Sequence, residues 1–202
     1  MNNPIQETKK SAQSKFITVV SGLPRSGTSM AMKMLEAGGM APVTDNLRTA
    51  DLDNPKGYYE FERVKKMPEG DTAWLAEASG KAVKVISALL EYLPDGYFYR
   101  VLFMRRKMEE ILASQQQMLI RADKPTDQVN DQQLAMIYTK HLSSIQSWLS
   151  KKPNFSVLYL DYNLLLADPS KYASEINHFV DGRLDVENML KAVDPSLYRQ
   201  RK

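Results

Sequence analysis

The feature that most constrains this chain is a short apolar run that leads through a glycine turn into a helix. Residues 16–20 are apolar or β-branched, which is typical of a buried strand. Gly22 marks a turn directly after that run. Methionine and leucine then recur at helical spacing over residues 30–35, and the pair Gly38-Gly39 is a helix-stop signal. The sequence therefore predicts a strand, a glycine loop and a helix, in that order.

The same alternation continues along the chain. Further strands are expected at residues 82–86, 99–104 and 157–160. Helices are expected at residues 108–119, 134–149, 170–180 and 185–192, with a short helix at 62–67 inside an otherwise irregular 41–71 segment. Strands that alternate with helices indicate a parallel sheet. We therefore predict an α/β fold of three layers, P-loop-like, with a central parallel sheet flanked by helices.

Length and composition favour one domain of ordinary globular type. Residues 1–14 are polar and are expected to be a flexible N-terminal tail, and residues 15–202 to form a single α/β domain. The absence of cysteine excludes disulfides, thiolate zinc sites and cysteine nucleophiles. Only two histidines are present, so no metal site is predicted.

Charge and hydropathy limit the possible partners. The net charge of +3 is too small to indicate a nucleic-acid surface. No apolar run approaches the roughly 18 residues that span a membrane, and the N-terminal segment lacks the apolar core of a signal peptide. The expectation is a soluble, cytoplasmic protein without nucleic-acid or membrane partners. The oligomeric state is not readable from the sequence.

The glycine loop has the sequence features of an anion-binding site. It reads Gly22-Leu23-Pro24-Arg25-Ser26-Gly27-Thr28-Ser29. A loop that leads from a strand into a helix N-terminus presents backbone N–H groups and the positive end of the helix dipole, which together bind anions. Serine, threonine and arginine side chains in this loop add donors. The spacing of the two glycines matches a Walker A loop, but Thr28 stands where that motif has its lysine. This departure argues against an ordinary ATPase or kinase.

The segment Pro24-Arg25-Ser26-Gly27-Thr28-Ser29 resembles the 5′-phosphosulfate loop of sulfotransferases, in which a basic residue precedes Ser-Gly-Thr. A second family signature is an arginine at a strand end with a serine eight residues later. Arg106 and Ser114 match that spacing, and Arg105 is adjacent. The resemblance implies that the chain binds 3′-phosphoadenosine 5′-phosphosulfate (PAPS), releases 3′-phosphoadenosine 5′-phosphate (PAP), and holds the 3′-phosphate with Arg106 and Ser114.

The resemblance also implies a mechanism, and at two points the chain departs from the family. Arg25 would neutralise the sulfonate and the bridging oxygen, while the loop N–H groups and Thr28 would hold the 5′-phosphate. Met30 replaces the family's adenine-stacking tryptophan, and the glycine-rich basic segment near the C-terminus of cytosolic members is absent. The acceptor would be a hydroxyl or amine of a small molecule or peptide.

The acceptor needs a catalytic base, and the family uses histidine or glutamate. Glu60 is the first candidate and Asp45 the second. Three further acidic residues remain open: Asp51, Asp53 and Glu62.

The remaining candidates have more ordinary interpretations. His141 lies on an apolar helix face and reads as a core histidine, whereas His178 reads as a helix-surface residue. Asp161 ends a strand and is interpreted as structural, or as orienting a loop hydroxyl.

Two other functions are consistent with the residues. One is a P-loop kinase-like protein that uses ATP and magnesium, which Asp161 favours and Thr28 disfavours. The other is a non-catalytic module that binds anions. Acceptor specificity would lie in residues 41–80 and 122–150, which carry no signature of a particular acceptor.

Overall fold

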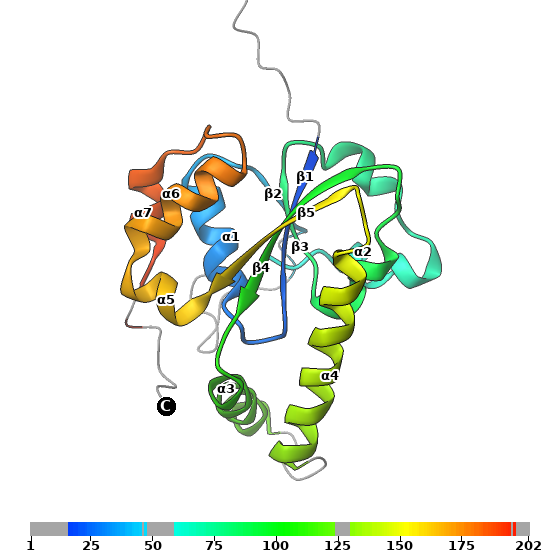
Figure 1. The fold of residues 1–202 in the computed structure, drawn as a ribbon, viewed down its shortest axis with the longest axis vertical. Helices are drawn as coiled ribbons and strands as arrows, with labels where there is room; N and C mark the ends of the chain where they lie inside the picture. The colour runs from blue at the N-terminus through cyan, green and yellow to red at the C-terminus, as the bar shows by residue number, and fades with distance from the viewer. Residues whose placement is uncertain (1–15, 46, 48–58, 124–129, 195, 197–202) are drawn as a thin grey trace, which may run out of the picture.

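A computed structural model describes residues 16–45, 47, 59–123, 130–194 and 196. The predicted tail at residues 1–14, Asp51 and Asp53 lie outside the described residues. Within the described part, a parallel sheet is covered by helices on both faces (Figure 1). The predicted three-layer α/β fold is confirmed.

The sheet has five strands in the order β2-β3-β1-β4-β5, and every neighbouring pair is parallel. The strands are β1 Phe16–Gly22, β2 Pro42–Val43, β3 Ala82–Lys84, β4 Phe98–Arg105 and β5 Phe155–Asp161. All residues of the central strand β1 are buried, as its apolar composition predicts. Because all the strands are parallel, their carboxyl ends meet at one edge of the sheet, where ligands bind in such folds.

Two apolar cores lie on opposite faces of the sheet. One face is covered by α1 Thr28–Ala37, α5 Tyr162–Ala167, α6 Pro169–Phe179 and α7 Val186–Ala192. The other face is covered by α2 Glu62–Lys65, α4 Asp131–Leu149 and the 3₁₀ helices η1 Met67–Glu69, η2 Ala73–Glu77 and η3 Ser87–Tyr92. Helix α3 Met108–Arg121 follows β4 beyond the carboxyl edge (Figure 1).

The structure corrects three expectations. The segment 41–71, interpreted as irregular apart from one short helix, also contributes strand β2, which is only two residues long and begins with Pro42. The strand expected at 82–86 ends at Lys84, because Ile86 is the N-terminal cap of η3. Helix α5 was missed because its apolar residues continue the apolar run of β5 without a glycine or proline between them.

No described helix is both long enough and apolar enough to cross a membrane.

Gly27 in the glycine loop and Gly39 just after α1 offer a matched pair of substitutions. Gly27 and Gly39 have φ angles of 100° and 99°. A Cβ on Gly27 would lie 2.4 Å from the ring of Tyr162, whereas a Cβ on Gly39 would meet nothing within 4 Å. We expect Gly39→Ala to cost only the strain of a left-handed backbone, about 1–2 kcal/mol. Gly27→Ala adds overpacking and should lower the free energy of unfolding by about 1–3 kcal/mol more. Urea denaturation of the two variants measures the difference, and equal losses would contradict the steric argument.

Candidate active site

The loop between β1 and α1 lies at the carboxyl edge of the sheet, as predicted. Its backbone enters the left-handed region at Arg25, with φ 69°, and again at Gly27. The Ser26 hydroxyl is buried and donates to the Leu23 carbonyl oxygen over 2.7 Å, so it closes the turn from inside. The first turn of α1 has no side-chain cap and no acidic residue. An anion therefore meets the positive end of a ten-residue helix without a competing negative charge.

Arg106 holds this loop from the end of β4. Its Nη1 donates to the Arg25 carbonyl oxygen over 3.1 Å, and its Nε donates to Glu110 Oε2 over 2.8 Å. Glu110 is fully buried and also accepts from Asn163 Nδ2 over 2.9 Å. The guanidinium carbon lies 4.6 Å from the ring centroid of Tyr162. Arg106 thus links the loop backbone to α3 and α5.

Arg25 and Ser114 meet above the loop. Arg25 Nε donates to Ser114 Oγ over 2.9 Å, although the two residues are 89 positions apart in the sequence. Ser114 is buried on α3. The structure therefore brings together three residues that the sequence singled out, namely Arg25, Arg106 and Ser114.

Lys84 is a site residue that the sequence interpretation missed. It ends β3, and its side chain is only 12% exposed. Its Nζ donates to Ser29 Oγ over 3.3 Å and lies 4.0 Å from Glu60 Oε1. The signal that could have revealed it is a lysine at the carboxyl end of an otherwise apolar strand.

The predicted acidic candidates lie on the segment beside β3. Glu60 has its carboxylate 4.0 Å from the ammonium groups of both Lys84 and Lys65. The Asp45 carboxylate instead forms hydrogen bonds with the backbone. It accepts from the N–H groups of Glu62, over 2.7 Å, and Leu47, over 3.1 Å. The hydrogen bond from Glu62 is the main cause that holds the pKa of Asp45 below its ordinary value. Asp45 is therefore a weaker base than an unperturbed aspartate. Glu62 is exposed and pairs with Lys65.

Asp161 has the contacts of a helix cap. Its Oδ1 accepts from the backbone N–H groups of Asn163 and Leu164, over 3.0 and 3.1 Å, at the start of α5. The structural interpretation is supported by these contacts. Among the residues that the structure describes, no group of three or more histidine, aspartate or glutamate side chains is placed to hold a metal ion.

The buried pair of Arg106 and Glu110 gives a test of how the loop is held. Glu110→Gln would leave the guanidinium, whose side chain is 8% exposed, without its counter-charge. We expect a loss of about 3–5 kcal/mol in the free energy of unfolding, as for other buried pairs that lose one partner. Glu109→Gln on the exposed side of the same helix turn is the control, with an expected change within about 0.5 kcal/mol. Similar unfolding midpoints for both variants would contradict this description.

Comparison with known proteins agrees with this geometry. The family model described as the sulfotransferase domain matches residues 17–202. No curated protein sequence matches the chain significantly.

Solved structures of low sequence identity share the fold. A sulfotransferase domain from the curacin biosynthetic pathway has a TM-score of 0.52 at 14% identity and is matched over 91% of this chain and 79% of its own. The sulfotransferase domain of the Synechococcus PCC 7002 olefin synthase has a TM-score of 0.55 at 14% identity, over 94% and 81%. Retinol dehydratase, solved with androsterone and the inactive cofactor PAP, has a TM-score of 0.52 at 17% identity, over 87% and 62%.

The structure has a glycine loop at a helix N-terminus, where Arg25, Arg106 and Ser114 meet. The family match over residues 17–202 agrees with this arrangement. The chain belongs to the sulfotransferase domain family.

Proposed function

We propose that this protein is a PAPS-dependent sulfotransferase that transfers a sulfonate group to a hydroxyl or amine of a small-molecule or peptide acceptor. The observation that carries the proposal is the hydrogen bond from Arg25 to Ser114, which joins the phosphate loop to the helix that follows β4. That bond places a loop cation and a helix hydroxyl together at the N-terminus of α1.

The residues present fit a nucleotide with two separated anionic groups. The uncapped N-terminus of α1 and the hydroxyls of Thr28 and Ser29 suit the 5′-phosphosulfate end. Arg106, two residues before α3, and Ser114, within α3, suit a 3′-phosphate, because hydroxyl and guanidinium groups are good phosphate donors. Arg106 also donates to the loop backbone, so binding at either end would be coupled through this residue.

The proposed roles follow from charge and position. When bound, PAPS supplies an activated sulfonate whose leaving group is its 5′-phosphate. Two cations lie at the loop: Arg25 is part of it, and Lys84 reaches its Ser29 from β3. Such preorganised donors stabilise the charge that develops on the transferring group and the leaving oxygen. Glu60, between Lys84 and Lys65, orients the Lys84 ammonium.

The ATP–magnesium alternative was favoured by Asp161, which the structure shows as a helix cap. Asp161, the candidate magnesium ligand, uses Oδ1 to cap α5. Thr28 still stands in the place of the Walker lysine. No described contact favours this alternative over the sulfotransferase proposal.

Nucleotide preference tests the proposal. Calorimetric titration should show that PAP binds more tightly than ADP or ATP–magnesium, with no change on adding EDTA. Ser114→Ala should weaken PAP binding by about 1–2 kcal/mol, or roughly tenfold, through loss of one hydrogen bond to a charged group, and should leave ADP binding unchanged. Ser143→Ala, an exposed serine on α4, is the control. Tighter binding of ATP–magnesium would reject the proposed function, and no binding of any nucleotide would favour the anion module.

Removal of the Arg25 charge tests the catalytic role. With radiolabelled PAPS as donor and 2-naphthol as acceptor, Arg25→Ala should lose about 100-fold or more in transfer rate, because the loop cation would stabilise charge in the transition state. Arg25→Lys retains the charge and should recover part of the loss. Transfer by Arg25→Ala at the unmodified protein's rate would remove Arg25 from the catalytic machinery.

A further inference from the structure

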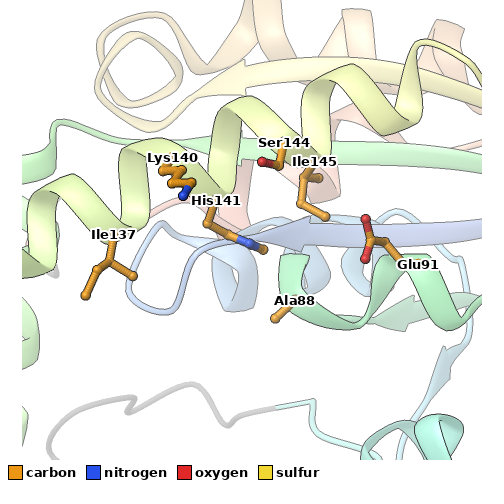
Figure 2. A pocket seen from close by; sticks show the side chains of 7 residues that line it. All are labelled: Ala88, Glu91, Ile137, Lys140, His141, Ser144 and Ile145. Atoms are coloured by element: carbon orange, nitrogen blue, oxygen red, sulfur yellow. The ribbon is translucent and has the colours of Figure 1, made fainter.

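A hollow of about 400 Å³ lies between η3 and α4, on the face of the sheet opposite α1 (Figure 2). Its walls are apolar at Ala88, Ile137 and Ile145. Ile137 is 57% exposed at this wall. None of the predicted site residues lines this hollow.

His141 projects from α4 into this hollow, toward η3 (Figure 2). Its Nε2 lies 2.9 Å from the Oγ of Ser87, which is 1% exposed. The hydrogen bond to a buried hydroxyl fixes the plane of the ring. When the Ser87 Oγ accepts the proton of Nε2, the other ring nitrogen keeps its lone pair and can accept a proton. The sequence interpretation of His141 as a core histidine is therefore incomplete, since the residue is partly exposed and lines a cavity.

The chain leads from Lys84, which contacts the glycine loop, to Ser87, which contacts His141. Ser87 follows Lys84 by three residues, a distance that an extended chain covers in at most about 11 Å. Lys84 in turn contacts Ser29 of the loop. The segment from Lys84 to Ser87 therefore connects the carboxyl end of β3, where Lys84 contacts the glycine loop, to the residue that holds His141 in the hollow.

We propose that this hollow binds the acceptor and that His141 is the catalytic base, an inference that rests on the proposed sulfotransferase function. The acceptor class is a compound with an apolar body and a hydroxyl group, since Ala88, Ile137 and Ile145 supply an apolar wall and the His141 ring faces the cavity. Lys140, Glu91 and Ser144 supply the polar part of the lining.

The reaction balances with PAPS as the sulfonate donor. The acceptor O–H bond breaks, and its proton moves to the unbonded ring nitrogen of His141. The acceptor oxygen forms a bond to sulfur. The bond between sulfur and the bridging oxygen breaks, and its electron pair stays on the phosphate of PAP. Glu60, paired with two lysines, then acts on Lys84 and does not take the acceptor proton.

The chain contains only two histidines, so the chemical modification of each can be followed separately. His178 is exposed in the last turn of α6 and serves as an internal control. In the PAP-saturated protein, diethylpyrocarbonate modification of each histidine is followed by mass spectrometry. 2-Naphthol at ten times its dissociation constant should slow modification of His141 about tenfold by occupying the hollow, and should leave His178 unchanged.

Transfer kinetics provide the second measurement. His141→Ala should lose about 100-fold or more in transfer of labelled sulfonate to 2-naphthol, within the usual range for a general base. Added imidazole should restore part of the rate, because the truncated side chain leaves room for it. His178→Gln should keep the unmodified rate. PAP affinity should be the same in all three proteins, which also shows that the variants are folded.

The outcomes separate this inference from the proposed function. Equal modification of His141 with and without 2-naphthol would overturn the acceptor site. A transfer rate in His141→Ala close to that of the unmodified protein would overturn the catalytic role. In both cases normal PAP binding would leave the proposed function standing. Failure of the unmodified protein to bind PAP would overturn the proposed function, and this inference with it.

Discussion

The site depends on the hydrogen-bonded ion pair between Arg106 and Glu110. Glu110 is fully buried, and Arg106 and Asn163 both donate to it, which offsets the cost of burying its charge. The same guanidinium donates to the carbonyl oxygen of Arg25. One buried pair therefore joins three separate stretches of the chain: the glycine loop, the stretch from the end of β4 into α3, and α5.

This arrangement divides the basic residues of the site into two roles. Arg106 has a buried counter-charge and holds the loop in shape, whereas Arg25 and Lys84 contact hydroxyl groups on Ser114 and Ser29. A loop that contains Arg25 and is contacted by Lys84 would suit the proposed sulfonate transfer, because catalysis of such a displacement is chiefly positioning and charge stabilisation. In the family resemblance Arg106 is a ligand of the 3′-phosphate, and here it would combine that role with support of the loop.

The two faces of the sheet are covered by different kinds of helix. One face is covered by α1, α5, α6 and α7 around one apolar core. The opposite face is covered by short 3₁₀ helices and by α4, and there the hollow with His141 remains open (Figure 2). Under the proposed function, the nucleotide would bind at the carboxyl edge and the acceptor would approach from this face.

The sequence by itself determined the strand–loop–helix unit, the parallel α/β fold and the spacing of Arg106 and Ser114. These depend on local patterns: the period of apolar residues, the conformational freedom of Gly27 and the order of the elements. It did not reveal β2, which is too short to show a period, or α5, whose apolar residues merge with those of β5.

Only the tertiary structure decided which side chains meet. Lys84 reaches Ser29 across 55 residues of sequence, and Ser87 reaches His141 across 54. The first contact depends on the register of β1 against β3. The second depends on how α4 packs over η3. Pairing across a sheet and packing of a helix are set by the summed burial of many residues, so no short sequence pattern encodes them.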